Sequence, residues 1–326
     1  MEITKKEIRT MSRLGMRGAI FGILLPEMAA ENSRLKILTA DLALLSGMDR
    51  LQKAAPDTVL NMGIAEQNMI GTAAGLALGG YQVIATTYAS FVAVRSLEFV
   101  RQFLSNLQAP VTLIGSASGM PSGKSGVSHL ATEDLAFIRP LPNIVLLSPA
   151  DALEAVLMTK WALSSNKPCY IRLTGGLNTP AVFGADYEFK PGEVVEVATG
   201  ENIAILATGL MVAEAVKTRD ILATSGITPA VYHVGTLNPL DTAKIATILE
   251  QHQLVITVEE HNIVGGLGSA IAEVRAELGR AAKVLRLGMA DYMKLGTQDY
   301  MWEQIGITAC KQAEFIQTKW AEITAQ

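Results

Sequence analysis

A single glutamate stands among small and apolar residues in the segment NMGIAEQNMIGTAAGLALGG, residues 61–80. Glu66 opens a run rich in glycine and alanine, which is typical of a helix that another group approaches closely. Burial favours the protonated form of a carboxyl group, so a glutamate in such surroundings is suited to proton transfer or to a strong hydrogen bond. The alternative is an exposed first-turn residue whose charge complements the helix dipole.

Two aromatic residues could form a second part of a site. Tyr88 and Phe91 are three residues apart, directly after an apolar strand pattern. At the start of a helix they would share one face. Packing in the core is the alternative interpretation.

The loop GMPSGKSGVSH, residues 119–129, ends in a polar side chain that could do chemistry. Its Gly-Lys-Ser is also the end of a nucleotide phosphate-binding loop, but the first glycine of that motif would fall at position 118, which is Ser118. The residues that follow continue as a loop, so we do not predict a phosphate-binding loop. His129 is then either an ordinary loop histidine or an imidazole that donates and accepts hydrogen bonds in a site.

Composition limits the class of protein. The 326 residues are 49% hydrophobic and only 18% charged, against about 25% charged in an average soluble domain. No apolar run reaches the length that spans a bilayer, so the apolar excess predicts a large core, a subunit interface, or both. The net charge of −4 argues against general nucleic-acid binding. Two distant cysteines and an N-terminus without an apolar stretch favour a reducing, cytoplasmic location and no metal site in this chain.

The elements that must position these residues alternate between apolar strand patterns and amphipathic helix patterns. Such βα units predict an α/β fold with two parallel-sheet, three-layer domains. We expect the first domain over residues 1–175, a linker over 176–200 that holds glycine, proline and asparagine, and a smaller domain over 201–326. The partial glycine motif GGLGSA in the second domain lacks the last glycine of a dinucleotide fingerprint, so it indicates close helix packing.

The chain resembles the transketolase family over nearly its whole length. The motifs that carry the resemblance occur in the order found in that family: GIAEQ, GTAAGLA, YASF, the loop 119–129, LPNIVLLSPAD and VITVEEHNIVGGLGSA. The family has a diphosphate-binding, a pyrimidine-binding and a C-terminal domain. The chain is similar to the last two only, and it contains no GDG motif of the first. The resemblance implies a thiamine diphosphate-dependent enzyme whose diphosphate and Mg²⁺ are held mainly by a partner, the diphosphate-binding transketolase subunit, in a heterotetramer.

The resemblance also implies roles for single residues. Glu66 matches the glutamate that hydrogen-bonds N1′ of the thiamine aminopyrimidine, and Tyr88 and Phe91 match the pocket around that ring. Asp41 matches an acidic position near the cofactor and the subunit interface. His129 matches the histidine that hydrogen-bonds the donor sugar near its reacting carbon.

Substrate recognition departs from the family pattern. Arg13 and Arg172 match arginines that grip the sugar phosphate, but Ser125 replaces an aspartate that reads a sugar hydroxyl. Ala117 replaces a phosphate-binding histidine, and Lys124 is a new cation in the loop.

We therefore expect transfer of a two-carbon ketol unit from an unusual ketose phosphate, such as apulose 4-phosphate, or from a sulfosugar. The acceptor would be an aldose phosphate such as glyceraldehyde 3-phosphate. A β subunit of a 2-oxoacid dehydrogenase, or a non-catalytic protein of the same fold, is the alternative.

Overall fold

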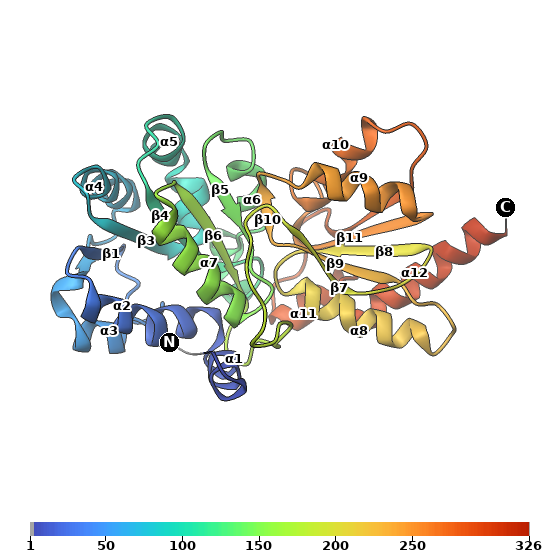
Figure 1. The fold of residues 1–326 in the computed structure, drawn as a ribbon, viewed down its shortest axis with the longest axis horizontal. Coiled ribbons are helices and arrows are strands. Elements are labelled where there is room, and N and C mark those ends of the chain that lie inside the picture. The colour runs from blue at the N-terminus through green and yellow to red at the C-terminus, as the bar shows by residue number, and fades with distance from the viewer. Residues whose placement is uncertain (1–2, 326) are drawn as a thin grey trace.

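The computed structural model describes residues 3–325 and consists of two α/β halves side by side (Figure 1). The first half is built on a seven-stranded sheet in the order β10-β5-β6-β4-β3-β1-β2. Six of its strands are parallel, and the edge strand β10 pairs antiparallel with β5. The strands are β1 (Leu35–Thr39), β2 (Val59–Asn61), β3 (Gln82–Tyr88), β4 (Val111–Ser118), β5 (Val145–Leu147), β6 (Cys169–Thr174) and β10 (Thr236–Asn238).

Helices connect these strands, and their ends follow local capping rules. Thr4 and Glu7 form a reciprocal capping box at the first helix, and the Asp151 side chain accepts the Glu154 N–H at the start of α7. The helical segments of this half are α1 (Lys5–Ala19), η1 (Ile20–Leu24), α2 (Leu25–Glu31), α3 (Asp49–Ala54), η2 (Pro56–Thr58), α4 (Glu66–Leu78), η3 (Phe91–Arg95), α5 (Leu97–Phe99), η4 (Val100–Asn106), η5 (Gly123–Ser125), η6 (Val127–His129), α6 (Asp134–Ile138) and α7 (Ala152–Ser165).

The second half is built on a five-stranded sheet in the order β12-β11-β8-β9-β7, in which only the edge strand β7 is antiparallel. Helices α9 and α10 lie on one side of this sheet and α8 and α12 on the other (Figure 1). The elements are β7 (Val194–Ala198), β8 (Ile203–Ala207), α8 (Met211–Ala223), β9 (Ala230–Val234), α9 (Thr242–Gln251), β11 (Leu254–Asn262), α10 (Leu267–Ala276), β12 (Lys283–Met289), α11 (Gln298–Gln304) and α12 (Ala309–Thr324).

Alternate residues of the buried strands face two different hydrophobic cores. Ile37 belongs to one core and Leu38 to the other, and Ile205 and Leu206 are divided in the same way in the second half. This alternation follows from the two-residue period of a strand. It confirms the predicted α/β fold of two three-layer units, with the correction that each sheet is mainly rather than entirely parallel.

The two halves share structure across the predicted domain boundary. β7 begins at Val194, inside the predicted linker 176–200, so that linker is too long at its C-terminal end. β10 lies within the predicted second domain but completes the first sheet by pairing with β5. The sequence did not reveal this exchange because a three-residue edge strand carries almost no periodic signal.

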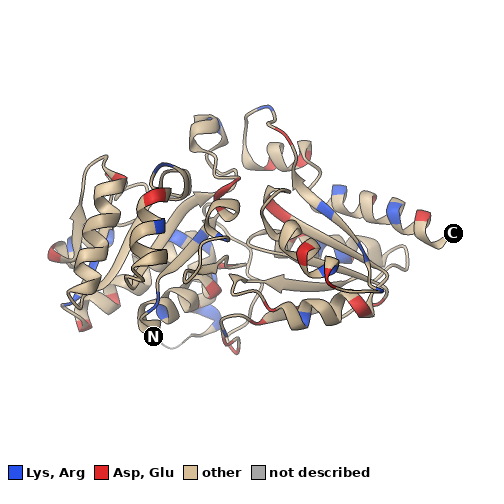
Figure 2. Cartoon of the chain, turned by 90° about the horizontal axis from the view of Figure 1, so that it is seen from above, with Lys and Arg blue, Asp and Glu red and all other residues tan. Residues whose placement is uncertain are grey.

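The glycine motif near α10 packs tightly, as predicted. A Cβ on Gly266 would lie 1.9 Å from Glu259 Oε2, so no larger residue fits there. Charges of both signs are interspersed along the helices of both halves (Figure 2). Within residues 3–325, none of the helices has the length and apolar character needed to cross a bilayer.

Candidate active site at the carboxyl edge of the first sheet

The predicted site residues follow the carboxyl ends of neighbouring parallel strands. Asp41 comes after β1, Glu66 after β2, Tyr88 ends β3, and β4 leads into the loop 119–129. Strands β2, β1, β3 and β4 are consecutive in the sheet, so these segments meet at one edge. Open α/β sheets bind ligands in the crevice outside these strand ends.

Two residues at this edge have left-handed backbone conformations that are uncommon outside glycine. The φ angle is 58° at Asp41 and 52° at Ala117. Asp41 is held there by Asn61, whose side chain accepts the Asp41 N–H and donates to the Asp41 carboxylate. Such strain is concentrated at functional sites in proteins, which is consistent with a site at this edge.

Three of the predicted residues form an aromatic cluster. The ring centroids of Tyr88 and Phe91 are 5.8 Å apart, and the His129 ring meets both edge-on, at 6.0 Å from Tyr88 and 5.4 Å from Phe91. The Ser128 hydroxyl lies 3.0 Å from His129 Nδ1. The cluster is only half-buried, so its rings are available to a ligand.

Glu66 is buried at the start of α4, next to this cluster. Its side chain is 5% exposed, and Arg95 Nη1 lies 2.6 Å from Glu66 Oε1. The guanidinium carbon of Arg95 lies 4.2 Å from the centroid of the Phe91 ring, within the range of a cation–π interaction. The burial agrees with the interpretation of Glu66 as a buried carboxyl group.

The Arg95 contact was missed from the sequence. Phe91 and Arg95 are four residues apart, a spacing that places two side chains on one helical face and was the available signal.

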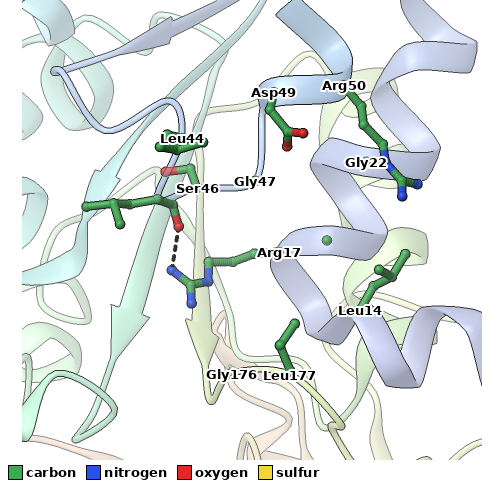
Figure 3. Close-up of a pocket in the computed structure, with 12 residues that line it drawn as sticks. Leu14, Arg17, Gly22, Leu44, Ser46, Gly47, Asp49, Arg50, Gly176 and Leu177 are labelled. Carbon is green, nitrogen blue, oxygen red and sulfur yellow. Dashed lines mark hydrogen bonds between the residues drawn. The ribbon is translucent and has the colours of Figure 1, made fainter.

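A cavity of about 290 Å³ opens between α1, α3 and the loop after β1 (Figure 3). Arg17 crosses this cavity and donates from Nη1 to the Leu45 carbonyl at 2.9 Å. Burial lowers the pKa of the Arg17 guanidinium. Ser46 and Arg50 add polar groups to the wall, and glycines at positions 18, 22, 47 and 176 leave its space open.

Arg17 lines this cavity, whereas Arg13, which the sequence predicted at the phosphate, is exposed and does not. The two arginines are separated by Gly15, whose φ of 70° breaks the helical course of α1. A Cβ at Gly15 would lie 1.9 Å from the Gly176 carbonyl oxygen, so this kink requires glycine.

Arg172 does not reach the site surface, which contradicts the predicted phosphate contact. Its side chain is 1% exposed and its Nε donates to both carboxylate oxygens of Asp134 at 3.0 Å. Its Nη2 donates to the carbonyls of Ala131 and Glu260. These donors are thus used in contacts with Asp134 and Ala131 of the first half and Glu260 of the second half. Arg172 therefore joins the two halves.

The remaining loop residues lie at the surface. Ser125 and Lys124 are exposed in η5, and the Asp41 side chain is exposed beside Asn61. Among residues 3–325 there is no group of three or more histidine, cysteine, aspartate or glutamate side chains that could hold a metal ion.

Comparison with known proteins gives the family. The model of the transketolase pyrimidine-binding domain matches residues 16–179, and that of the transketolase C-terminal domain matches residues 192–311. A putative transketolase C-terminal section from Methanocaldococcus jannaschii is 33% identical over 296 residues, 90% of this chain and 92% of that protein. One chain of the apulose-4-phosphate transketolase of Actinobacillus succinogenes is 37% identical over 259 residues, 79% of this chain and 83% of that protein. The solved structure of a split gene transketolase, an inactive beta4 tetramer, superposes with a TM-score of 0.83 at 34% identity, covering 94% of this chain and 97% of that one.

Proposed function

The chain belongs to the transketolase family, and we propose that it is the subunit of a split, thiamine diphosphate-dependent transketolase that carries the pyrimidine-binding and C-terminal domains. The observation that carries the proposal is the convergence of Glu66, Phe91, Tyr88 and His129 at one sheet edge. These side chains come from three separate segments and combine a buried carboxyl group, two aromatic rings and an imidazole.

The chemistry of this pocket fits the aminopyrimidine of thiamine. The Arg95 guanidinium already occupies it as a flat group that gives an N–H to Glu66 and lies over Phe91. An aminopyrimidine is likewise flat and needs a carboxyl partner at a ring nitrogen and an aromatic neighbour. When bound, the cofactor supplies the nucleophilic carbon and the electron sink for the transfer of a ketol unit.

The residues of this chain have distinct tasks in the proposed reaction. The Glu66 carboxyl group would hold the aminopyrimidine by a hydrogen bond, and its burial would keep water from weakening that bond. Tyr88 and Phe91 would contact the ring of the cofactor. The His129 imidazole donates to or accepts from the oxygen atoms of the donor sugar. Arg17 binds the far end of the substrate, where a guanidinium suits a phosphate or sulfonate group.

We propose that a two-carbon ketol unit moves from a ketose phosphate to an aldose phosphate such as glyceraldehyde 3-phosphate. An unusual donor, such as apulose 4-phosphate, is supported by the 37% identity to one chain of an apulose-4-phosphate transketolase. The departures at Ala117, Lys124 and Ser125 support it as well, since they alter the loop that would read the sugar.

A partner subunit would complete the site by holding the diphosphate and Mg²⁺, in a heterotetramer of two copies of each chain. Apolar side chains exposed on the segments around the site support a covering partner. They are Leu44, Leu45, Ile64, Val94 and Leu177, whose exposed fractions run from 49% to 78%. Such residues are usually buried when they occur together.

Calorimetry with thiamine diphosphate and Mg²⁺ tests the proposal. We expect binding only when this chain is mixed with a diphosphate-binding partner chain, and ketose turnover by the mixture that Glu66→Ala abolishes. Tight binding by the chain alone, or unchanged turnover in the Glu66→Ala complex, would refute the assignment. Acyl transfer to lipoamide in place of ketose turnover would indicate a component of a 2-oxoacid dehydrogenase.

A further inference from the structure

The loop 119–129 of the first half is tied to a buried acid of the second half. The Met120 N–H donates to Glu260 Oε1 at 2.8 Å, across 140 positions of sequence. Glu260 is 2% exposed and comes from β11. Gly119 lies directly against it, because a Cβ built on Gly119 would be 2.5 Å from Glu260 Cδ.

Glu260 is itself held in place by groups from both halves. Gln298 of α11 donates to the same oxygen at 2.7 Å, and Arg172 donates to the Glu260 backbone carbonyl at 2.8 Å. Burial raises the pKa of Glu260, and the Gln298 hydrogen bond and the Arg172 charge oppose that rise. The Glu260 carboxyl group therefore has a fixed orientation toward the loop.

A second contact holds the middle of the loop against the same region. A Cβ on Gly123 would lie 2.4 Å from Met301 Sδ and 2.6 Å from the Gly296 carbonyl oxygen. The base of the loop is closed by Gly119 and Ala131, which exchange two backbone hydrogen bonds. The part between these points carries His129 to the aromatic cluster.

We propose that Glu260 is a positioning residue for the substrate loop: through the Met120 N–H it fixes the loop so that His129 stays against Tyr88 and Phe91. The inference rests on the proposed function, since it gives the C-terminal half a task in donor binding. Glu260 does not touch the reacting atoms in this arrangement and acts only through the loop.

The adjacent Glu259 offers a matched control. It lies on the same strand and is fully buried, but its carboxylate accepts the N–H groups of Leu267 and Gly268 at the start of α10. Replacing it removes a buried carboxylate of the same kind without touching the loop.

The test compares Glu260→Leu, Glu260→Gln and Glu259→Leu in the complete complex. Glu260→Leu leaves the Met120 N–H without its acceptor, so we expect the donor KM to rise about tenfold. The Kd for thiamine diphosphate should stay within about twofold, because the hydrogen bonds of Glu260 go to Met120, Gln298 and Arg172, not to Glu66. Glu260→Gln keeps an acceptor oxygen and should recover most of the donor affinity. Glu259→Leu should lower the melting temperature without raising the donor KM.

Hydrogen–deuterium exchange on the full chain without partner or substrate gives an independent readout. We expect faster exchange over residues 120–129 in Glu260→Leu and not in Glu259→Leu. If Glu260→Leu does not fold, Gln298→Leu removes one support of Glu260 from a half-buried position and should change exchange in the same direction.

An unchanged donor KM and unchanged exchange in the Glu260 variants would overturn the inference, as would an equal rise of the donor KM in Glu259→Leu. A wild-type complex that turns over no ketose would refute the proposed function instead. The exchange measurement would still decide whether Glu260 holds the loop.

Discussion

Arg95 Nη1 lies 2.6 Å from Glu66 Oε1 while its guanidinium covers the Phe91 ring. The arginine thus occupies the two contacts that the proposed aminopyrimidine needs. The Arg95 side chain is 49% exposed, so the pair is partly solvated and can open at low cost.

Replacing Arg95 should therefore tighten cofactor binding. In the complete complex, Arg95→Met should lower the Kd for thiamine diphosphate by up to about fivefold, since a partly exposed ion pair is worth roughly 0.2–1 kcal/mol. Calorimetry measures this change. Arg101→Met is the control, because Arg101 is 55% exposed and pairs with Glu98 further along the same helical stretch. Weaker binding in Arg95→Met would mean that Arg95 supports the bound cofactor.

The two arginines of the first helix should have very different effects on donor binding. Arg17→Met should raise the donor KM by about tenfold to a hundredfold, since it removes a charged hydrogen-bond donor from the cavity. Arg13→Met should change it by less than about twofold, because Arg13 is exposed outside the cavity. The donor KM of each variant is measured by steady-state kinetics, and the melting temperatures are compared to exclude unfolding. A larger rise of the donor KM in Arg13→Met than in Arg17→Met would support the role expected for Arg13 from the sequence.

The Arg172–Asp134 pair should matter for stability. Arg172→Met leaves the buried Asp134 carboxylate without its cation, which costs about 3–5 kcal/mol in typical proteins. Adding Asp134→Leu should recover part of this loss in the free energy of unfolding by urea. An Arg172→Met variant with native stability and a raised donor KM would instead support a phosphate contact.

Stability at acid pH should depend on His261. Burial lowers the pKa of this imidazole from 6.5 to about 4, against the opposing charge of Asp134. Its neutral Nε2 accepts the Leu135 N–H, and Glu259 and Asp134 face the ring from within 4 Å. The unfolded chain takes up a proton below pH 6.5 and the folded chain only below about pH 4. The stability contribution is thus complete above pH 6.5 and is lost as the pH falls to 4.

His261→Gln removes this proton uptake from both states. The fall in unfolding free energy between pH 6.5 and 4 should shrink by on the order of 3 kcal/mol relative to wild type. Burial raises the pKa of Glu259 to about 7, so this carboxyl group acts in the opposite direction. Glu259 lies 3.6 Å from His261 Nδ1, so the double variant with Glu259→Gln is compared with Glu259→Gln alone to separate the two groups. An equal pH dependence in both proteins would show that His261 does not carry the effect.

The sequence predicted those features whose signal is local. The stretch EQNMIGTAAGLAL is α4, residues 66–78, and the apolar runs before Tyr88 and before the loop 119–129 are β3 and β4. The pairing of Tyr88 with Phe91 was predicted from their spacing, and their role beside a ring was implied by the resemblance to the family.

Features that depend on tertiary context were missed. The bond between Arg95 and Glu66 joins two helical segments, and the choice of Arg17 over Arg13 depends on the kink at Gly15. Arg172 was assigned to the sugar phosphate by its resemblance to family arginines, and only the structure reveals the buried Asp134 as its partner.

The exchange of β10 between the halves constrains how this protein could be divided or recombined. A cut in the segment before β7 would leave β5 as an open sheet edge, and open edges template aggregation. A chimaera that takes its second half from a related chain would have to bring a β10 that fits the β5 of its host. The two halves therefore cannot be exchanged independently at the boundary between the two family matches. The smallest unit that can be exchanged is both halves together.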